Sequence, residues 1–145
     1  MAETIHVDIV SAEGEIFAGE ATQVFLPGSQ GDLGVYPRHA PLLTTLKPGV
    51  VRVESEGREE QVFYVGGGAL EVQPHLVTVL ADTAARAHDL DEAAAEAAKQ
   101  RAEEALRTRT DKIDIAEAQA EIARTVAQLK AIKAIRDIER LGQRR

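Results

Sequence analysis

The spacing of the apolar residues changes once along the chain, near residue 84, and this change limits the fold more than any other feature. From Ile5 onward apolar residues alternate with polar ones, which is typical of a strand with one buried face. Similar short runs continue to Ala81, and glycine or proline separates most of them. Many short strands at this spacing indicate an antiparallel sandwich or barrel. We expect strands from Ile5 and over residues 15–17, 22–26, 42–46, 50–54, 61–65, 69–72 and 76–81.

After Ala84 the chain is rich in alanine and charged residues. Residues 89–109 contain no glycine or proline, and Asp89 and Glu92 have the spacing of a capping box, so they predict a helix of about five turns. Residues 110–143 predict a second helix, with Asp114 and Glu117 at its start and Gly142 at its stop. Its apolar stripe comprises Ile115, Ile122, Val126, Leu129, Ile132, Ile135 and Ile138.

The sequence therefore predicts an α+β chain, with an N-terminal antiparallel β-sandwich over residues 1–86 and a C-terminal two-helix hairpin over residues 87–145. A few polar residues around Arg107 to Lys112 would join the two helices. The first helix offers the hairpin mostly alanine. Since each methyl group buries little area, at about 25 cal/mol per Å² this contact contributes modestly. The hairpin is either a marginally stable element that opens when a partner competes for the second helix, or a static element packed on the sandwich. The alanines of this contact are Ala95, Ala98, Ala102 and Ala105.

The segment GSQGDLGVYPRHAPL, residues 28–42, concentrates glycine and proline. Its glycines lack the spacing of a nucleotide-binding fingerprint, and no Lys-Ser or Lys-Thr pair completes a phosphate loop. The segment is better explained as a set of turns between sandwich strands. The run GGGAL, residues 66–70, indicates a bulge or a turn with positive φ.

Charge is unevenly distributed along the chain. Residues 1–88 have a net charge of −7, residues 89–123 of −5 and residues 124–145 of +5. The bases of the last segment recur at three and four residues, so they share one side of the helix, either as a solvated face or as a strip that docks on an acidic partner. An acidic body argues against general nucleic-acid binding, which stays a minor alternative for the basic end alone. The stripe comprises Lys130, Lys133, Arg136, Arg140 and Arg144.

Several classes of site are disfavoured. The chain has no cysteine, which excludes disulfides and cysteine-ligated metal centres. The histidines show no ligand spacing, and no carboxylate pair stands in a distinctive apolar setting, so we predict no metal site and no catalytic residues. With no leader and no apolar run long enough to cross a membrane, we expect a soluble protein of a reducing compartment. The four histidines are His6, His39, His75 and His88.

Four stretches of the chain carry a resemblance to a known family. They are HVDIVSAEGEIFAG, PGSQGDLGVYPRHAPLLTTLKPG, GGGALEVQPHLVTVLADTA and DLDEAAAEAAKQRAEEAL. Together they resemble the ε subunit of bacterial F-type ATP synthases. The match runs from near the N-terminus to about Leu129 and is looser in the last helix. The resemblance implies a non-catalytic subunit of the central stalk that couples c-ring rotation to ATP synthesis. Its partners would be the γ subunit, the c-ring and the α and β subunits, on the cytoplasmic side of the plasma membrane, with no nucleic acid and no required cofactor.

The resemblance also assigns roles to residues. It implies that Gln30, Gly31, Asp32, Leu33 and His39 contact the c-ring, and that Ser11, Ala40, Pro41, Leu42 and Leu43 contact γ. In this family the helices extend along γ and inhibit ATP hydrolysis, and here Lys130, Lys133, Arg136 and Arg140 would dock on β. A helix of about 28 residues spans roughly 42 Å, which is long enough for such a reach.

Some members of the family bind ATP on the folded hairpin. The corresponding positions here are Leu90, Asp91, Arg101 and Arg124. Ala94 and Gln128 stand where arginines are expected, and a missing guanidinium removes charge-assisted bonds to phosphate. We therefore expect ATP to be at most a weak regulatory ligand. The alternatives to a rotor subunit are a free-standing interaction module of sandwich and hairpin, or an enzyme that uses surface carboxylates.

Overall fold

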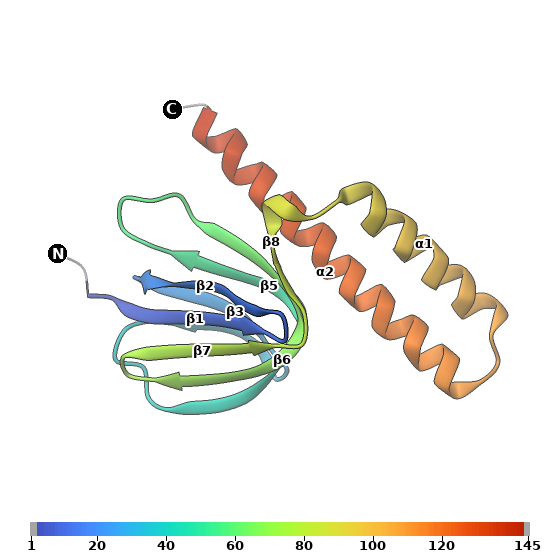
Figure 1. Ribbon diagram of the computed structural model, residues 1–145, viewed down its shortest axis with the longest axis horizontal. Helices are drawn as coiled ribbons and strands as arrows, with labels where there is room; N and C mark the ends of the chain where they lie inside the picture. The colour runs from blue at the N-terminus through green and yellow to red at the C-terminus, as the bar shows by residue number, and fades with distance from the viewer. Residues whose placement is uncertain (1–2, 144–145) are drawn as a thin grey trace.

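The computed structural model describes residues 3–143 and shows a curled β-sheet followed by two long helices (Figure 1). A 3₁₀ turn, η1 (Ala87–Asp89), leads from the sheet to α1 (Glu92–Thr108) and α2 (Lys112–Gln143). The predicted β-sandwich with a C-terminal two-helix hairpin is confirmed. The strands are β1 (Ile5–Ser11), β2 (Gly14–Ala21), β3 (Gln23–Gly28), β4 (Gly31–Val35), β5 (Leu42–Glu54), β6 (Gln61–Gln73), β7 (Leu76–Ala81) and β8 (Ala84–Arg86).

The strands form one mixed sheet in the order β2-β1-β7-β6-β5-β3-β4, and β8 pairs with β6. Every pair is antiparallel except β1 and β7, in which Val7 lies opposite Val77 in a parallel register. The prediction of a wholly antiparallel sandwich is wrong at this pair. No hairpin connects β1 to β7, so no short turn imposes the antiparallel direction on them.

Two long strands replace four predicted short ones. β5 continues through Pro48 and β6 continues through its three glycines, with Pro48 opposite Gly66 in an unbroken register. Gly67 and Gly68 have φ angles of 104° and 139°, so the expected positive φ is confirmed. The predicted bulge or turn is wrong, because both residues lie within β6 in a continuous register. The C-terminal half of β6 pairs with β7, and its N-terminal half pairs with β8. One long strand therefore pairs with different partners along its length. Proline and glycine therefore bend these strands without ending them.

The glycine-rich segment at residues 28–42 is only partly turn. It contains β4, which pairs antiparallel with β3, so the prediction of turns alone is wrong there. The alternation of apolar and polar residues that is typical of a strand is hard to recognise in β4. Gly34 occupies an outward position, where a polar side chain would have indicated a strand. On either side of it, Leu33 is half-buried and Val35 is fully buried.

The core of the sandwich consists of inward-facing aliphatic residues and two phenylalanines. Ile5, Val7 and Ile9 of β1 are fully buried, as the period of two predicts. The rings of Phe17 and Phe63 pack at a centroid distance of 5.3 Å. No residue of α1 or α2 belongs to this core cluster, so the sandwich has a core of its own within the described residues.

The starts of the two helices differ from the predicted ones. Asp91 caps α1, and its Oδ1 accepts the N–H of Ala94 at 3.1 Å. The predicted cap, Asp89, belongs to η1 instead, and the extended backbone of Leu90 separates η1 from α1. α2 begins at Lys112, two residues before Asp114. Gly142 is the penultimate residue of α2, which ends at Gln143, where the sequence predicts the helix to end.

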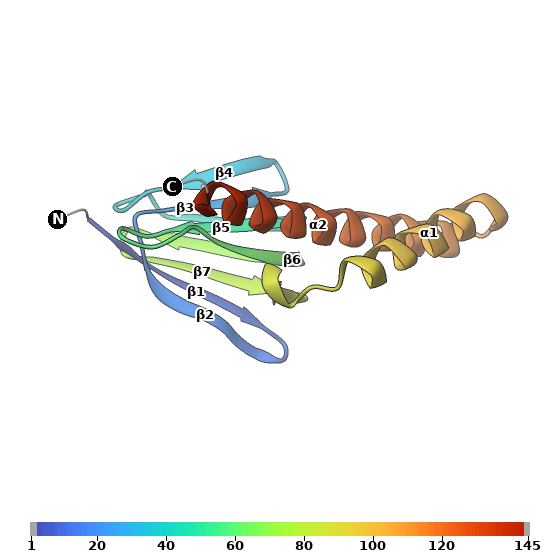
Figure 2. The same cartoon turned by 90° about the horizontal axis from the view of Figure 1, so that it is seen from above.

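The hairpin touches the sheet through one half of one helix. The second half of α2 lies on β5 and β6, where Ala127 and Ala131 pack against Val62 and Tyr64. α1 packs chiefly on the first half of α2, and both project beyond the sheet (Figures 1 and 2). Small side chains close the seam between the two helices, since Ala102 and Ala118 are buried there.

Candidate functional site

The first candidate surface is the tip of the β3–β4 hairpin. Gly28 pairs with Gly31, whose φ is 134°, so Ser29 and Gln30 form a two-residue turn. Hydrogen bonds fasten this turn to β5, because the Ser29 N–H donates to the Thr45 carbonyl at 2.9 Å and the two hydroxyls lie 2.7 Å apart. The tip is thereby a braced polar surface.

Four of the five residues expected at the c-ring lie on or beside this tip. Gln30, Gly31 and Asp32 are exposed, and Leu33 is half-buried behind them. Asp32 lies 3.7 Å from the ammonium group of Lys47. His39 lies further along the chain, where its Nδ1 is 2.6 Å from the Ala40 carbonyl oxygen.

The second candidate surface follows His39. Pro41, Leu42 and Leu43 line a shallow groove of about 480 Å³ together with residues 71–74 at the end of β6. Leu43 is 77% exposed, an unusual setting for a leucine in a strand. Ala40 and Pro41 are exposed beside it, so this end of β5 presents an apolar face.

Ser11, the remaining residue expected at γ, lies apart from that groove. The register places Ser11 opposite Ala81 of β7. Leu42 lies opposite Val72 of β6, which in turn lies opposite Val77 of β7. Four residues along a strand correspond to about 13 Å. Any partner that contacts both positions must therefore cover the outer face between them.

That outer face contains an exposed leucine that sequence reasoning missed. Leu80 is 53% exposed and lies between Val10 of β1 and Ala69 of β6. Leu80 could have been found from the sequence, because it is an apolar residue at an outward position of β7, where the alternation predicts a polar residue.

The third candidate surface is the basic face of α2, defined as Lys130, Lys133, Arg136 and Arg140. All four side chains are exposed. At 100° per residue Lys133, Arg136 and Arg140 lie opposite Ala127, Ala131 and Ile138, which pack toward the sheet. Lys130 lies at the edge of this face, where it lines a groove between α2 and strands β3 to β5. Arg144, which continues the predicted stripe, lies outside the described residues.

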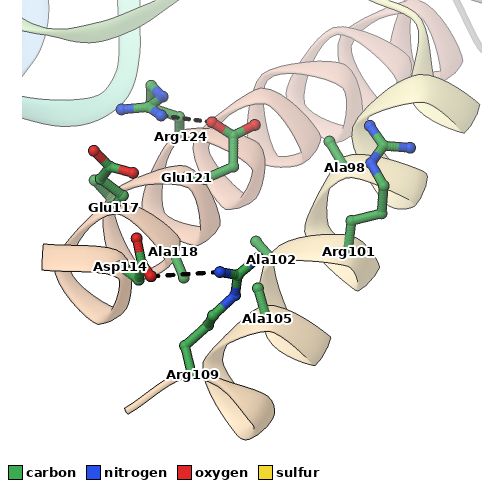
Figure 3. Close-up of a pocket in the computed structure, with 11 residues that line it drawn as sticks. Ala98, Arg101, Ala102, Ala105, Arg109, Asp114, Glu117, Ala118, Glu121 and Arg124 are labelled. Atoms are coloured by element: carbon green, nitrogen blue, oxygen red, sulfur yellow. Dashed lines mark hydrogen bonds and ion pairs between the residues drawn. The ribbon is translucent and has the colours of Figure 1, made fainter. Parts of the chain in front are cut away.

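The fourth candidate is a groove of about 690 Å³ between α1 and α2, at the free end of the hairpin (Figure 3). It brings Arg101 and Arg124 together with a third arginine, Arg109. Arg124 pairs with Glu121 at 2.5 Å and Arg109 pairs with Asp114 at 3.4 Å (Figure 3).

Two residues expected at a nucleotide lie outside this groove. Leu90 packs against the cluster between α2 and the sheet, and Asp91 caps α1. With Glu117 added, the groove contains three acidic and three basic side chains. Its neutral balance suits a triphosphate poorly, because most of the arginine charge is already compensated.

Two shifted pKa values lie elsewhere on the sandwich. The pKa of His6 is raised by its 2.8 Å hydrogen bond to Asp8 and further by the nearby Glu20, while burial acts in the opposite direction. Burial raises the pKa of Glu60, and the Arg52 guanidinium at 2.7 Å opposes that shift.

Residues 3–143, which the structure describes, present neither a metal site nor a membrane-spanning helix. They contain no group of three or more histidine, cysteine or acidic side chains placed to hold a metal ion. They also contain no helix that is long and apolar enough to cross a membrane.

Family models match most of the chain. The β-sandwich domain of the ATP synthase delta/epsilon chain matches residues 4–87, and the long α-helix domain of the same chain matches residues 88–133. The ATP synthase epsilon chain of Nitrosococcus oceani is 63% identical over 136 residues, covering 94% of this chain and 97% of the relative. That of Alkalilimnicola ehrlichii is 60% identical over 133 residues, covering 92% and 95%.

Solved structures share the fold at low sequence identity. A chain in the Euglena gracilis mitochondrial ATP synthase, a structure of OSCP, F1 and the c-ring, is 18% identical with a TM-score of 0.80. The match covers 89% of this chain and 81% of that one. A chain in the central stalk and c-ring structure of the Tetrahymena thermophila mitochondrial ATP synthase is 12% identical with a TM-score of 0.62, covering 90% and 98%.

Proposed function

The chain belongs to the ATP synthase epsilon chains, and from that premise we propose that it is a non-catalytic subunit of the central stalk, on the cytoplasmic side of the bacterial plasma membrane. In this role it couples c-ring rotation to ATP synthesis through the sandwich and restrains ATP hydrolysis through the helices. The membership rests on the 63% identity to an epsilon chain over nearly its whole length. Its proposed partners are the γ subunit, the c-ring and the α and β subunits.

The sandwich supplies two contact surfaces in this proposal. The braced β3–β4 tip, with Gln30 and Asp32 exposed, faces the polar loops of the c-ring, and His39 is proposed as a further contact of the ring. The outer face of the sheet, with the exposed Leu43 and Leu80, faces γ. Leu80 thereby joins Ser11 and residues 40–43 in the γ contact.

The γ contact is tested by placing a charge on its most exposed leucine. Leu43→Glu should weaken binding to γ about ten-fold or more, because a carboxylate must be desolvated at an apolar contact. Ile113→Glu, at an equally exposed apolar residue of α2, is the matched control and should bind as the parent chain does. Equal affinities for the two variants in a titration of the isolated γ subunit would contradict the proposed contact.

Inhibition of hydrolysis is assigned to the basic face of α2. The observation that carries this assignment is that all four cations are exposed, and that Lys133, Arg136 and Arg140 lie opposite the docked face of the helix. Cations on a free face can meet an acidic segment of β once α2 leaves the sheet, and complementary charge then fixes the register of the contact.

The first experiment measures ATP hydrolysis by the cognate catalytic head. Rates are compared without the chain, with the full chain, and with a chain ending at His88, after binding of both has been verified. The full chain should suppress hydrolysis and the shortened chain should not. Equal rates with both bound chains would remove the inhibitory role and leave the coupling role intact.

Two variants that each remove three positive charges test whether the basic face of α2 is responsible for the inhibition. Changing Lys133, Arg136 and Arg140 to alanine should relieve it, since these cations are proposed to meet β. The control changes three exposed bases elsewhere, which are Arg58, Arg107 and Lys112. If the control relieves inhibition as strongly, net charge and not the basic face is responsible.

ATP is proposed to bind this chain weakly or not at all. Arg101 and Arg124 share the hairpin groove, but acidic side chains balance its charge, and Ala94 and Gln128 supply no guanidinium. Calorimetric titration of the full chain should show little heat with Mg-ATP. The double substitution Ala94→Arg and Gln128→Arg should raise the affinity about ten-fold or more, if these positions face the nucleotide.

A further inference from the structure

A second contact holds α2 in place, at the entrance to α1. Residues 87–92 lie against residues 134–139 of α2, and this contact is called the clasp. Its apolar part joins the buried Ala87 and the half-buried Leu90 to Ala134, Ile135 and Ile138. The clasp therefore connects the start of the hairpin to the last turns of α2.

One ion pair and one histidine–carboxylate contact cross the clasp. The Glu92 carboxylate, at the first residue of α1, lies 2.5 Å from Nη2 of Arg136. His88 of η1 places Nδ1 3.4 Å from the Glu139 carboxylate. Both contacts join residues that are more than 40 positions apart in the sequence, so they exist only while α2 is folded back.

Arg136 differs from the other members of the basic face. Within the described residues, it is the member that forms an ion pair, and Lys130, Lys133 and Arg140 form none. A guanidinium that is held by Glu92 cannot give the same donors to a second carboxylate. The folded chain thus occupies one of the cations proposed to dock on β.

We infer that Glu92 is a positioning residue that sequesters Arg136 and so sets how often the basic face is free to dock. This inference rests on the proposed inhibitory function of α2. Leaving the sheet and docking on an acidic partner then compete for the same side chain. An exposed pair of this kind shifts such an equilibrium by about two- to five-fold.

The test reads the position of α2 directly and does not depend on hydrolysis. A Cβ built on Gly142 would lie 2.8 Å from Oε1 of Glu59, so α2 ends beside the β5–β6 loop. The chain has no cysteine, so Glu59→Cys and Gly142→Cys give two unique thiols. The rate at which a short bis-maleimide joins them, in the assembled enzyme with its other accessible cysteines removed, reports the folded-back population.

Glu92→Gln is compared with Glu96→Gln in this background. Glu96 is exposed and lies one turn further along α1. The substitution Glu96→Gln removes the same negative charge as Glu92→Gln. Glu92→Gln should slow cross-linking about two- to five-fold, and Glu96→Gln should leave it unchanged. Reversing the pair, with Glu92→Arg and Arg136→Glu together, should restore the parental rate, because the attraction is restored in the opposite sense.

The outcomes separate this inference from the proposed function. Equal cross-linking rates for Glu92→Gln, Glu96→Gln and the parent chain would overturn the role of Glu92. Slower cross-linking with Glu92→Gln, accompanied by stronger inhibition of hydrolysis in the chain without the added cysteines, supports both. Slower cross-linking with unchanged hydrolysis supports the sequestering role and contradicts inhibition by the basic face.

Discussion

Gly68 shows how strongly a single residue can determine the sandwich. Its φ of 139° is open to glycine, and a Cβ at this position would lie 2.1 Å from the Leu80 carbonyl oxygen. Gly68→Ala should therefore lower the free energy of unfolding by about 2–4 kcal/mol, measured by urea denaturation. Gly34→Ala is the control, because its Cβ would meet Phe25 at an ordinary 3.5 Å and its φ is not positive. Similar stability of the two variants would contradict this account of the β6 bend.

His6 gives the sandwich a dependence on pH. The folded pKa of His6 is raised above the unfolded value, mainly by its hydrogen bond to Asp8. Its contribution to stability is therefore complete below the unfolded pKa of about 6.5 and disappears as pH rises through the folded value. His6→Gln should reduce the urea midpoint near pH 6 and have less effect near pH 9. A stability difference that grows with pH would contradict the assigned direction.

At the scale of elements, α2 is held by small side chains that fit closely against β5 and β6. Ala131 is fully buried against Val62 and Tyr64, so a larger charged residue cannot enter without displacing the helix. Ala131→Glu should lower the hydrogen-exchange protection of α2 about ten-fold or more, while β1 and β7 keep theirs. Ala116→Glu, at an exposed position of the same helix, should change neither. Joint loss of protection in helix and sheet would show that they unfold as one unit.

At the scale of the whole molecule, the sandwich and the hairpin have separate cores. Among residues 3–143 the sandwich core contains no residue of either helix, and α2 adds a second cluster on the outer surface of the sandwich. A chain ending at His88 should therefore stay folded, with native near-ultraviolet dichroism and a cooperative urea transition. The exposed faces of Val62 and Tyr64 should lower its midpoint modestly. A shortened chain without a cooperative transition would also disqualify it as the control for hydrolysis.

The sequence by itself determined the elements whose side chains repeat with a regular period. The alternation from Ile5 to Ile9 fixed a buried face of β1, and the alanine-rich run without glycine or proline fixed α1. These patterns are local, so the chain needs no distant contact to display them. The basic face of α2 was readable for the same reason, because three- and four-residue spacing places side chains on one side of a helix.

Only the tertiary structure decided which segments meet. Pro48 and the glycines at residues 66–68 read locally as breaks, but pairing between β5 and β6 carries both strands through them. The parallel pairing of β1 with β7 and the Glu92–Arg136 contact join positions far apart in the chain, which no local pattern encodes. Their partners are chosen by burial and charge across the folded molecule, and these exist only once the sheet has closed and α2 lies on it.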